Sequence, residues 1–238
     1  MPWFWRGLGE PVKTLGPGET ELAGGTPGRP VPSVRPPGAF DVGVCPTAAL
    51  ERQGDQVAVR HDRCVYCMRC RSGDGALDWA FDSDWAVESR EPLGPGFARS
   101  IHMRILDSGD CGGCLNELRQ LHSPLYSLHR FGVFVTPTPR QADVLVVVGP
   151  VTEGMAGALH AAYVAMPEPK RVMALGVCAL NGGVFAPSFA VRGGASAVVP
   201  VDIAVPGCPP PPLAILSALR TVMGRPLASA TRAGEVGR

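Results

Sequence analysis

The sequence has almost no net charge and no long apolar run. Its 238 residues carry a formal net charge of +1, and no basic block is large enough to dominate an interaction with phosphates. We therefore expect no nucleic-acid partner. No apolar run is long enough to span a bilayer, so we expect any attachment to a membrane to occur through partner subunits.

The amino terminus also lacks the sustained apolar stretch of a secretory signal, which leads us to expect a cytoplasmic protein. The eight cysteines of a chain that is not secreted are more typical of metal ligands than of disulfides. A nucleotide-binding loop is missing as well. Gly109-x-x-Gly112 has neither the three spaced glycines nor the following acidic residue of the dinucleotide fingerprint, so binding of NADH or flavin by this chain is unsupported.

The chain contains enough apolar residues, 45%, to bury a core, but its 30 glycines and 25 prolines indicate long loops or tails. We expect two folded domains separated by a Pro/Gly-rich linker. The expected division is a disordered segment over 1–38, a small domain over 39–83, a linker over 84–99, a larger domain over 100–226 and a disordered tail over 227–238.

The smaller domain contains the first cysteine set: Cys45, Cys64, Cys67 and Cys70. Three thiolates at i, i+3 and i+6 on a tight loop can each reach a different iron of one cubane cluster, and Cys45-Pro46 supplies a fourth. This arrangement favours a 4Fe-4S cluster. A tetrahedral zinc site more often uses two Cys-x2-Cys pairs, but zinc stays open as an alternative. The residues after Cys45 look like the start of a short helix, and Val57 and Val59 alternate as in a strand.

The larger domain alternates apolar strands with amphipathic helices, which predicts an α/β fold with a parallel sheet and right-handed crossovers. The expected strands are 101–106, 133–136, 142–149, 171–177 and 197–205, and the expected helices are about 115–130, 154–166 and 213–223.

The second cysteine set follows the ends of three of these strands: Cys111, Cys114, Cys178 and Cys208. Because the carboxyl ends of parallel strands meet at one edge of a sheet, where ligands bind in open α/β folds, we expect the four thiols to converge there. We interpret them as ligands of a second 4Fe-4S cluster, in a chain that moves electrons. A structural, redox-silent zinc module is the alternative of a different class.

At these residues the chain resembles a known family, the small electron-transfer subunits of energy-converting nickel-iron hydrogenases of the formate hydrogenlyase type and the B or 20 kDa subunit of respiratory complex I. The resemblance covers about 101–224. The matching segments are 139–145, 166–170, 176–178, 181–183, 199–202 and 205–210. The spacing Cys111-Gly-Gly-Cys114 is similar to the hydrogenase branch, whereas complex I proteins have adjacent cysteines. The upstream cysteines resemble a truncated half of a two-cluster ferredoxin fused to this subunit.

The resemblance implies a flavodoxin-like fold preceded by a small, truncated ferredoxin-like α+β domain. It implies two 4Fe-4S clusters, the second of them lying next to the catalytic or quinone site of a large partner subunit. The chain would then be the electron-transfer subunit of an oxidoreductase complex, peripheral on the cytoplasmic face of the membrane through other electron-transfer and membrane subunits. The large subunit must supply any nickel-iron chemistry, because a nickel-iron site needs paired Cys-x2-Cys motifs of its own and nothing here resembles such a site. A quinone-linked complex without hydrogen chemistry is the alternative.

The resemblance also assigns roles to two charged residues. Glu117 occupies the position of an acidic residue that the family keeps just after the second cysteine, which implies a part in a proton path. A solvent-facing glutamate in a first helical turn, favoured by the helix dipole, is the alternative. Arg140 matches an arginine near the cofactor or quinone end, with an ordinary surface loop arginine as its alternative.

Overall fold

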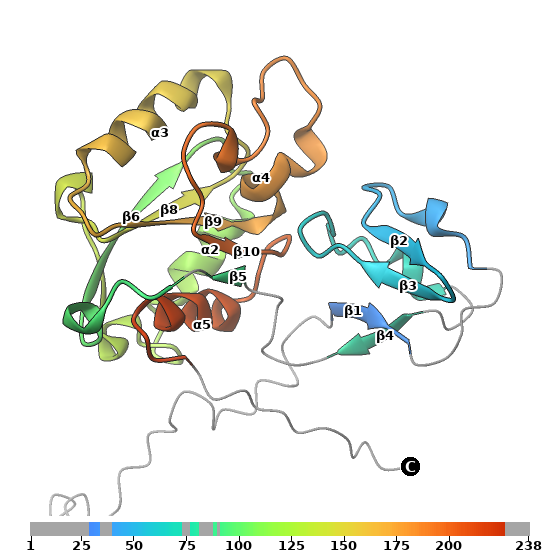
Figure 1. Ribbon diagram of the computed structural model, residues 1–238, viewed down its shortest axis with the longest axis horizontal. Helices are drawn as coiled ribbons and strands as arrows, with labels where there is room; N and C mark the ends of the chain where they lie inside the picture. The colour runs from blue at the N-terminus through green and yellow to red at the C-terminus, as the bar shows by residue number, and fades with distance from the viewer. Residues whose placement is uncertain (1–28, 34–39, 73–76, 81–87, 90, 227–238) are drawn as a thin grey trace, which may run out of the picture.

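The protein folds into two regions, shown in the computed structural model of Figure 1. The structure describes residues 29–33, 40–72, 77–80, 88–89 and 91–226. We call the described residues up to 80 the amino-terminal region and those from 88 onward the α/β region. The expectations for residues 1–28 and 227–238 lie outside the described residues.

The α/β region is built on one six-stranded sheet with the order β5-β10-β9-β8-β6-β7. Its strands are β5 (Glu88–Ser89), β6 (Ile101–Asp107), β7 (Val133–Val135), β8 (Val144–Val148), β9 (Arg171–Leu175) and β10 (Ile203–Val205). All pairings are parallel except that of β5 with β10. Numbered along the chain, the five parallel strands lie in the order 2-1-3-4-5, which is the flavodoxin-like order. The predicted fold of this region is confirmed.

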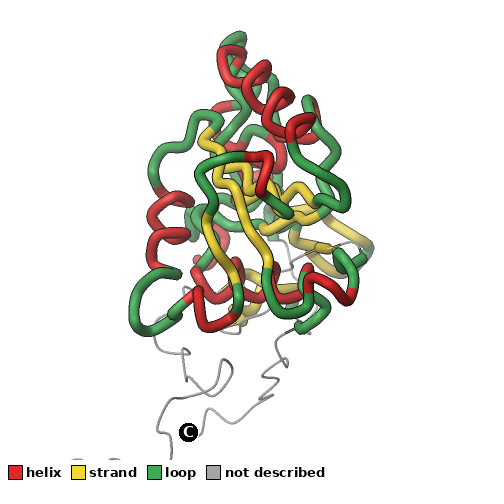
Figure 2. Tube along the Cα trace, turned by 90° about the vertical axis from the view of Figure 1, so that its left-hand side faces the viewer, coloured by secondary structure: helices red, strands yellow, loops and turns green. Residues whose placement is uncertain are grey.

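Helices cover both faces of the sheet, as the side view of Figure 2 shows. They are α2 (Gly113–Gln120), α3 (Glu153–Ala165), α4 (Gly176–Asn181) and α5 (Pro212–Val222). Along β8, Val144, Val146 and Val148 pack into the core under α2 and α5, while Leu145 and Val147 pack into the core under α3 and α4. A strand buried on both faces requires a continuous apolar sequence, and for this reason the sequence alone predicted β8.

Two elements are shorter than predicted. The helix expected over about 115–130 ends after Gln120, and the short 3-10 helix η5 (Leu128–Phe131) follows it after a series of turns. Pro124 accounts for this end, because a proline disfavours helical backbone in the residue before it. In the strand expected over 197–205 only Ile203–Val205 pairs, and Ala195–Ala197 forms a 3-10 turn, η8.

Much of the expected linker belongs to the α/β region. Strand β5 pairs with β10, and Leu93, only 7% exposed, packs into the core beneath α5. The Leu93 amide also donates a hydrogen bond to the Val222 carbonyl. Gly94 and Pro95 do form the turn at the start of η4 (Pro95–Phe97). The apolar side chains of Leu93 and Phe97 nevertheless pack against the core and hold the segment in place.

The amino-terminal region consists of two small antiparallel sheets around a core of Phe40, Leu50, Val57 and Leu77. The strands are β1 (Arg29–Pro32), which pairs with β4 (Leu77–Ala80), and β2 (Leu50–Gln53), which pairs with β3 (Gln56–Val59). Two short 3-10 helices, η2 (Val42–Val44) and η3 (Arg69–Ser72), complete it.

This region differs from expectation in two ways. Strand β1 lies within the segment expected to be disordered, because β4 supplies it with hydrogen-bonding partners. The residues after Cys45 form a turn leading into β2 instead of a helix. The Cys45 sulfur accepts the Ala49 amide, and Ala48 takes a left-handed conformation, φ 50°.

Candidate functional site

The second cysteine set lies at the carboxyl edge of the parallel sheet. Cys111 and Cys114 follow β6, Cys178 lies in α4 directly after β9, and Cys208 follows β10. Each thiol whose environment is resolved interacts electrostatically with other members: Cys114 with Cys111, Cys178 and Cys208, and Cys178 with Cys111 and Cys208. The structure therefore brings together four thiols that are separated by almost a hundred residues of sequence.

Two glycines make room for the sulfurs of this set. A Cβ on Gly176 would lie 2.5 Å from the sulfur of Cys114, and a Cβ on Gly183 would lie 2.6 Å from the sulfur of Cys178. Both glycines have positive φ, 83° and 56°, which other residues rarely adopt. Only backbone fits between these sulfurs and the neighbouring chain, so the amide groups come close to the thiols. The sequence motif contained Gly176, but only the packing reveals its contact with Cys114.

Polar side chains fix the loop that bears Cys111 and Cys114. Asp107 accepts hydrogen bonds from the amides of Gly109 and Asp110, at 2.9 and 2.7 Å, and Asp110 accepts those of Gly112 and Leu115, at 3.0 and 3.1 Å. Ser108 is fully buried, and its hydroxyl donates to the carbonyls at the end of β8. Sequence reasoning missed these supporting roles, although an aspartate just before a helix is a common signal for capping.

Electrostatics in this set favours a bound cation. Burial raises the pKa of Cys114, and the negative charges of Asp110 and the other three cysteines raise it further. Burial and the Cys208 and Cys111 thiolates raise the pKa of Cys178 to about 11. Thiolates are the metal-binding form of cysteine. Cys114 and Cys178 are buried and Cys111 and Cys208 are exposed, and a bound metal would stabilise all four as thiolates.

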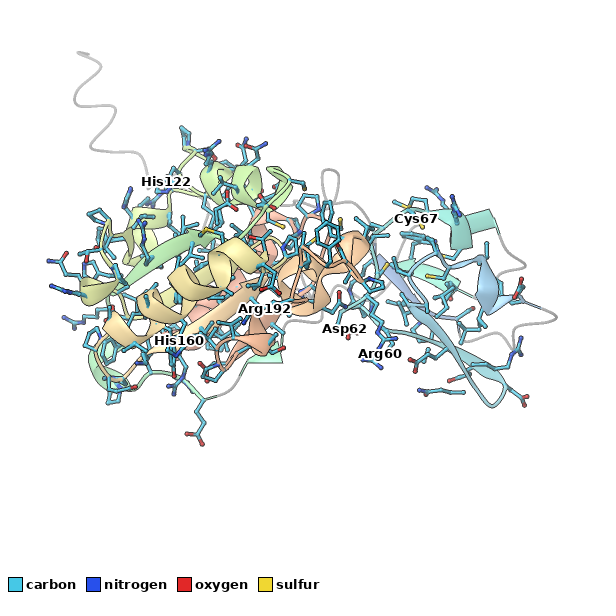
Figure 3. All side chains as sticks on the ribbon, turned by 90° about the horizontal axis from the view of Figure 1, so that it is seen from above. Arg60, Asp62, Cys67, His122, His160 and Arg192 are labelled. Carbon is cyan, nitrogen blue, oxygen red and sulfur yellow. The ribbon has the colours of Figure 1, made fainter. Side chains whose placement is uncertain are left out.

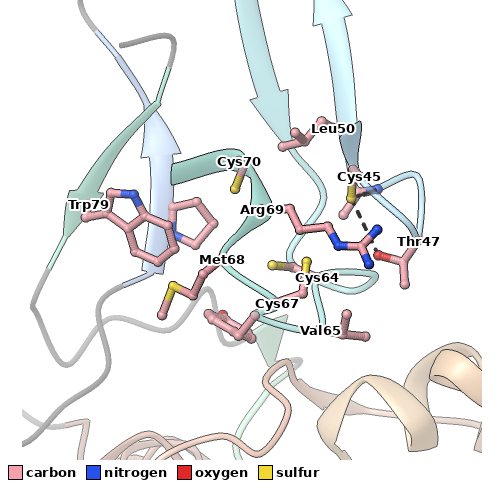
Figure 4. A pocket seen from close by; sticks show the side chains of 13 residues that line it. Cys45, Thr47, Leu50, Cys64, Val65, Cys67, Met68, Arg69, Cys70 and Trp79 are labelled. Carbon is pink, nitrogen blue, oxygen red and sulfur yellow. Dashed lines mark hydrogen bonds between the residues drawn. The ribbon is translucent and has the colours of Figure 1, made fainter. Parts of the chain in front are cut away.

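The first cysteine set surrounds a single pocket in the amino-terminal region (Figure 4). Its lining includes all four cysteines of the set together with Tyr66, Met68, Arg69 and Trp79. Burial raises the pKa of Cys64 to about 11 and also raises that of Cys70. Cys45 is different: burial acts to raise its pKa, but hydrogen bonds, led by the one from the Ala49 amide at 3.2 Å, lower it overall.

The backbone around this pocket is unusual. Ala48, Tyr66 and Met68 all have left-handed φ, at 50°, 54° and 63°, and each lies within three residues of a cysteine of the set. Such conformations are uncommon outside glycine and persist where the surroundings over-determine them. In this loop the left-handed residues alternate with the cysteines and turn the chain around the pocket.

Each set has four cysteine sulfurs, which is the number and type of donors that a cubane cluster uses. Within the described ranges, no three His, Cys, Asp or Glu side chains are arranged to hold one metal ion. A zinc site would require four sulfurs at about 2.3 Å from one centre. Four cysteines, each ligating a different iron, are the donor set of a cubane cluster.

The two charged residues singled out in the sequence are placed differently. Glu117 lies on α2, one turn after Cys114, and burial raises the pKa of its carboxyl group. Arg140 is exposed in the 3-10 helix η6 (Pro139–Gln141), just before the amino end of β8. That end of β8 is opposite to the end that leads toward the cysteines, and the role expected for Arg140 stays a prediction.

A hydrogen bond and a cleft lie at the junction of the two regions. The Asn181 side chain, at the end of α4, donates a hydrogen bond to the carbonyl of Asp62, two residues before Cys64. Figure 3 shows Asp62 and Arg60 at this junction. A cleft of about 270 Å³ lies beside it, lined by 59–62 on one side and by Leu180, Ala204 and Pro206 on the other.

No helix of the described chain has both the length and the apolar character needed to cross a bilayer.

Residues 111–222 match the family described as NADH ubiquinone oxidoreductase, 20 Kd subunit. An uncharacterized protein of Methanocaldococcus jannaschii is 43% identical over 130 residues, which cover 55% of this chain and 87% of that protein. Formate hydrogenlyase subunit 7 of Escherichia coli is 40% identical over 126 residues, 53% of this chain. The match spans about half, 49%, of that relative.

Among solved structures, the membrane-bound sulfane sulfur reductase, an archaeal respiratory membrane complex, contains a similar chain. It is 29% identical with a TM-score of 0.48, and the match covers 55% of this chain and 74% of that one. A chain of an NAD+-reducing nickel-iron hydrogenase is 21% identical with a TM-score of 0.44, over 53% of this chain and 93% of that one.

Proposed function

Because the chain belongs to the NADH-ubiquinone oxidoreductase 20 kDa subunit family, we propose that it is the electron-transfer subunit of a hydrogenase-like or complex I-like oxidoreductase and holds two 4Fe-4S clusters. The observation that carries this proposal is the convergence of Cys111, Cys114, Cys178 and Cys208 at the carboxyl edge of the sheet. The second ligand set would be Cys45, Cys64, Cys67 and Cys70, which line one pocket. Each cluster, when bound, would accept and return one electron.

The residues around each site have physical tasks in such a subunit. The thiolates hold the iron, and Gly176 and Gly183 leave room for backbone amides beside the sulfurs. The apolar cores under α2 and α5 and under α3 and α4 keep water from the inner side of the second site. Asp107, Asp110 and Ser108 hold the loop of Cys111 and Cys114 in place.

The partner would be a large subunit that contains the catalytic centre, next to the second cysteine set. Cys111 and Cys208 are the exposed members of this set, so the site opens toward the surface at the sheet edge. Glu117, half-buried one turn from Cys114, is our candidate for a proton-carrying residue at that interface. We place the complex at the cytoplasmic face of the membrane, with membrane subunits supplying the attachment.

The first test is the iron and acid-labile sulfide content of anaerobically purified protein, with EPR after reduction by dithionite. Two cubanes predict about eight iron and about eight sulfide per chain. About four of each would mean that one set does not bind a cluster. Zinc in place of iron would overturn the electron-transfer function and leave a structural metal module. Co-purification of a large subunit, and its nickel content, then separates hydrogen chemistry from quinone chemistry.

A further inference from the structure

Tyr66 lies in the loop of the first cysteine set and also packs against the α/β region. It lies between Cys64 and Cys67 in sequence and lines the pocket of the first set. Its side chain also packs against the core of the α/β region that contains Cys114. Its side chain interacts electrostatically with Cys64 of the first set and Cys208 of the second. One aromatic ring is therefore close to a cysteine of each set.

Tyr66 stands in an uncommon backbone conformation. Tyr66 has φ 54°, in the left-handed region that tyrosine seldom adopts. Met68, two residues later, is also left-handed, and its side chain is 37% exposed. Tyr66 packs against the core of the α/β region, whereas Met68 is partly exposed. An uncommon backbone conformation such as that of Tyr66 persists where its surroundings hold it.

A hydrogen bond fixes the two ligand-bearing segments to each other at the same junction. Asn181 donates from its side chain to the Asp62 carbonyl, and its side-chain oxygen accepts the Gly183 amide at 2.9 Å. Gly183 is the residue that packs against the sulfur of Cys178. The loop of the first set is therefore linked through one side chain to the segment that surrounds the second.

We propose that Tyr66 is the positioning residue that couples the two cysteine sites: its ring fills the space between them and excludes water, and the Asn181–Asp62 hydrogen bond holds their separation. This inference rests on the proposed function, since it assumes a cluster at each site. A dense, dry contact favours electron exchange, because the protein around a redox centre controls its solvent access and dielectric. With both clusters bound, each exchange would oxidise one of them by one electron and reduce the other by one, and no bond would form or break.

The test uses the full chain, purified anaerobically with any partner subunits that accompany it. The Tyr66→Ala variant is compared with Tyr66→Phe, which keeps the ring, and with Phe131→Ala, which removes an aromatic ring from the same core away from the cysteines. Three quantities are measured: iron per chain, the EPR spin–spin interaction between the two reduced clusters, and the rate of electron equilibration after flash reduction.

We expect Tyr66→Ala to keep both clusters and to lose fast equilibration, while Tyr66→Phe and Phe131→Ala equilibrate as the parent protein does. Asn181→Ala, which lies outside both ligand sets, should weaken the spin–spin interaction, because the separation is no longer held. It also serves as the test if Tyr66→Ala fails to fold.

Equilibration at the parent rate in both Tyr66→Ala and Asn181→Ala would overturn the inference, as would a parent protein with two clusters and no interaction between them. Neither result would affect the proposed function. A parent protein without iron would instead overturn the proposed function itself, and the iron measurement makes that failure visible separately.

Discussion

The two cysteine sites are built by opposite means. The second set is assembled from distant parts of the chain by a sheet whose central strand β8 is fully buried, so its geometry comes from a large core. In the first set three of four cysteines share one short loop, supported by four buried apolar residues and several left-handed residues. The fold of the α/β region therefore holds the second set in place. The first set lies in a region with a small core, and we expect bound metal to supply much of the stability of that region.

The largest expected effect tests this difference directly. Removing the metal with a chelator under anaerobic, reducing conditions should unfold residues 40–72 and leave the sheet intact, because metal binding supplies folding free energy only where the core is small. Hydrogen exchange followed by mass spectrometry measures both regions in one sample. Fast exchange over 40–72 with slow exchange in β6, β8 and β9 is the expected pattern. Protection retained throughout 40–72 in metal-free protein would contradict the comparison.

A glycine substitution tests whether the second cysteine site is as rigid as its packing indicates. Gly176→Ala adds a Cβ 2.5 Å from the Cys114 sulfur at φ 83°, and the buried sheet cannot yield to make room. Iron should fall from about eight to about four per chain, with the EPR signal of the first cluster kept. The control is Gly54→Ala in the β2–β3 turn, where the φ of 60° is also positive but a Cβ meets nothing within 4 Å. It should keep all its iron and cost about 1–2 kcal/mol of stability. Full iron in Gly176→Ala would show that the site is more adaptable than its packing implies.

The smallest expected effect concerns the segment that joins the regions. Leu93→Ala should lower the free energy of unfolding of the α/β region by about 2–4 kcal/mol, because it leaves a cavity beneath α5. Leu125→Ala is the matched control, since Leu125 is 61% exposed and its loss should change stability by no more than about 0.5 kcal/mol. Urea unfolding followed by circular dichroism measures both. Equal effects of the two substitutions would mean that the segment around Leu93 is a linker after all.

The sequence predicted the α/β region well because the patterns that indicate its strands and cysteine positions lie within short stretches of sequence. Strands such as β8 are continuous apolar runs, and a cysteine after each of three strand ends leads to one sheet edge. The errors arose where neighbours decide the outcome. Pro124 ended α2 early, and pairing with β10 gave structure to a stretch that reads as loop.

In the candidate site, too, the sequence revealed local patterns but not contacts between distant residues. The eight cysteines were found from their spacing, but the contacts of Gly176 with Cys114 and of Asn181 with Asp62 join residues more than sixty positions apart. Tyr66 reads as an ordinary residue between two ligands until the second region is seen packed against it.

The antiparallel pairing of β5 with β10 has a consequence for how the protein avoids self-association. An unpaired edge strand offers its amides and carbonyls to any extended chain, and sheets with open edges tend to aggregate. Here the segment that leads from the amino-terminal region covers the β10 edge, and the other edge ends in β7, which is only three residues long. Joining the two regions in one chain therefore also protects the sheet, and a fragment cut after Ser89 would expose the β10 edge and gain a route to edge-to-edge association.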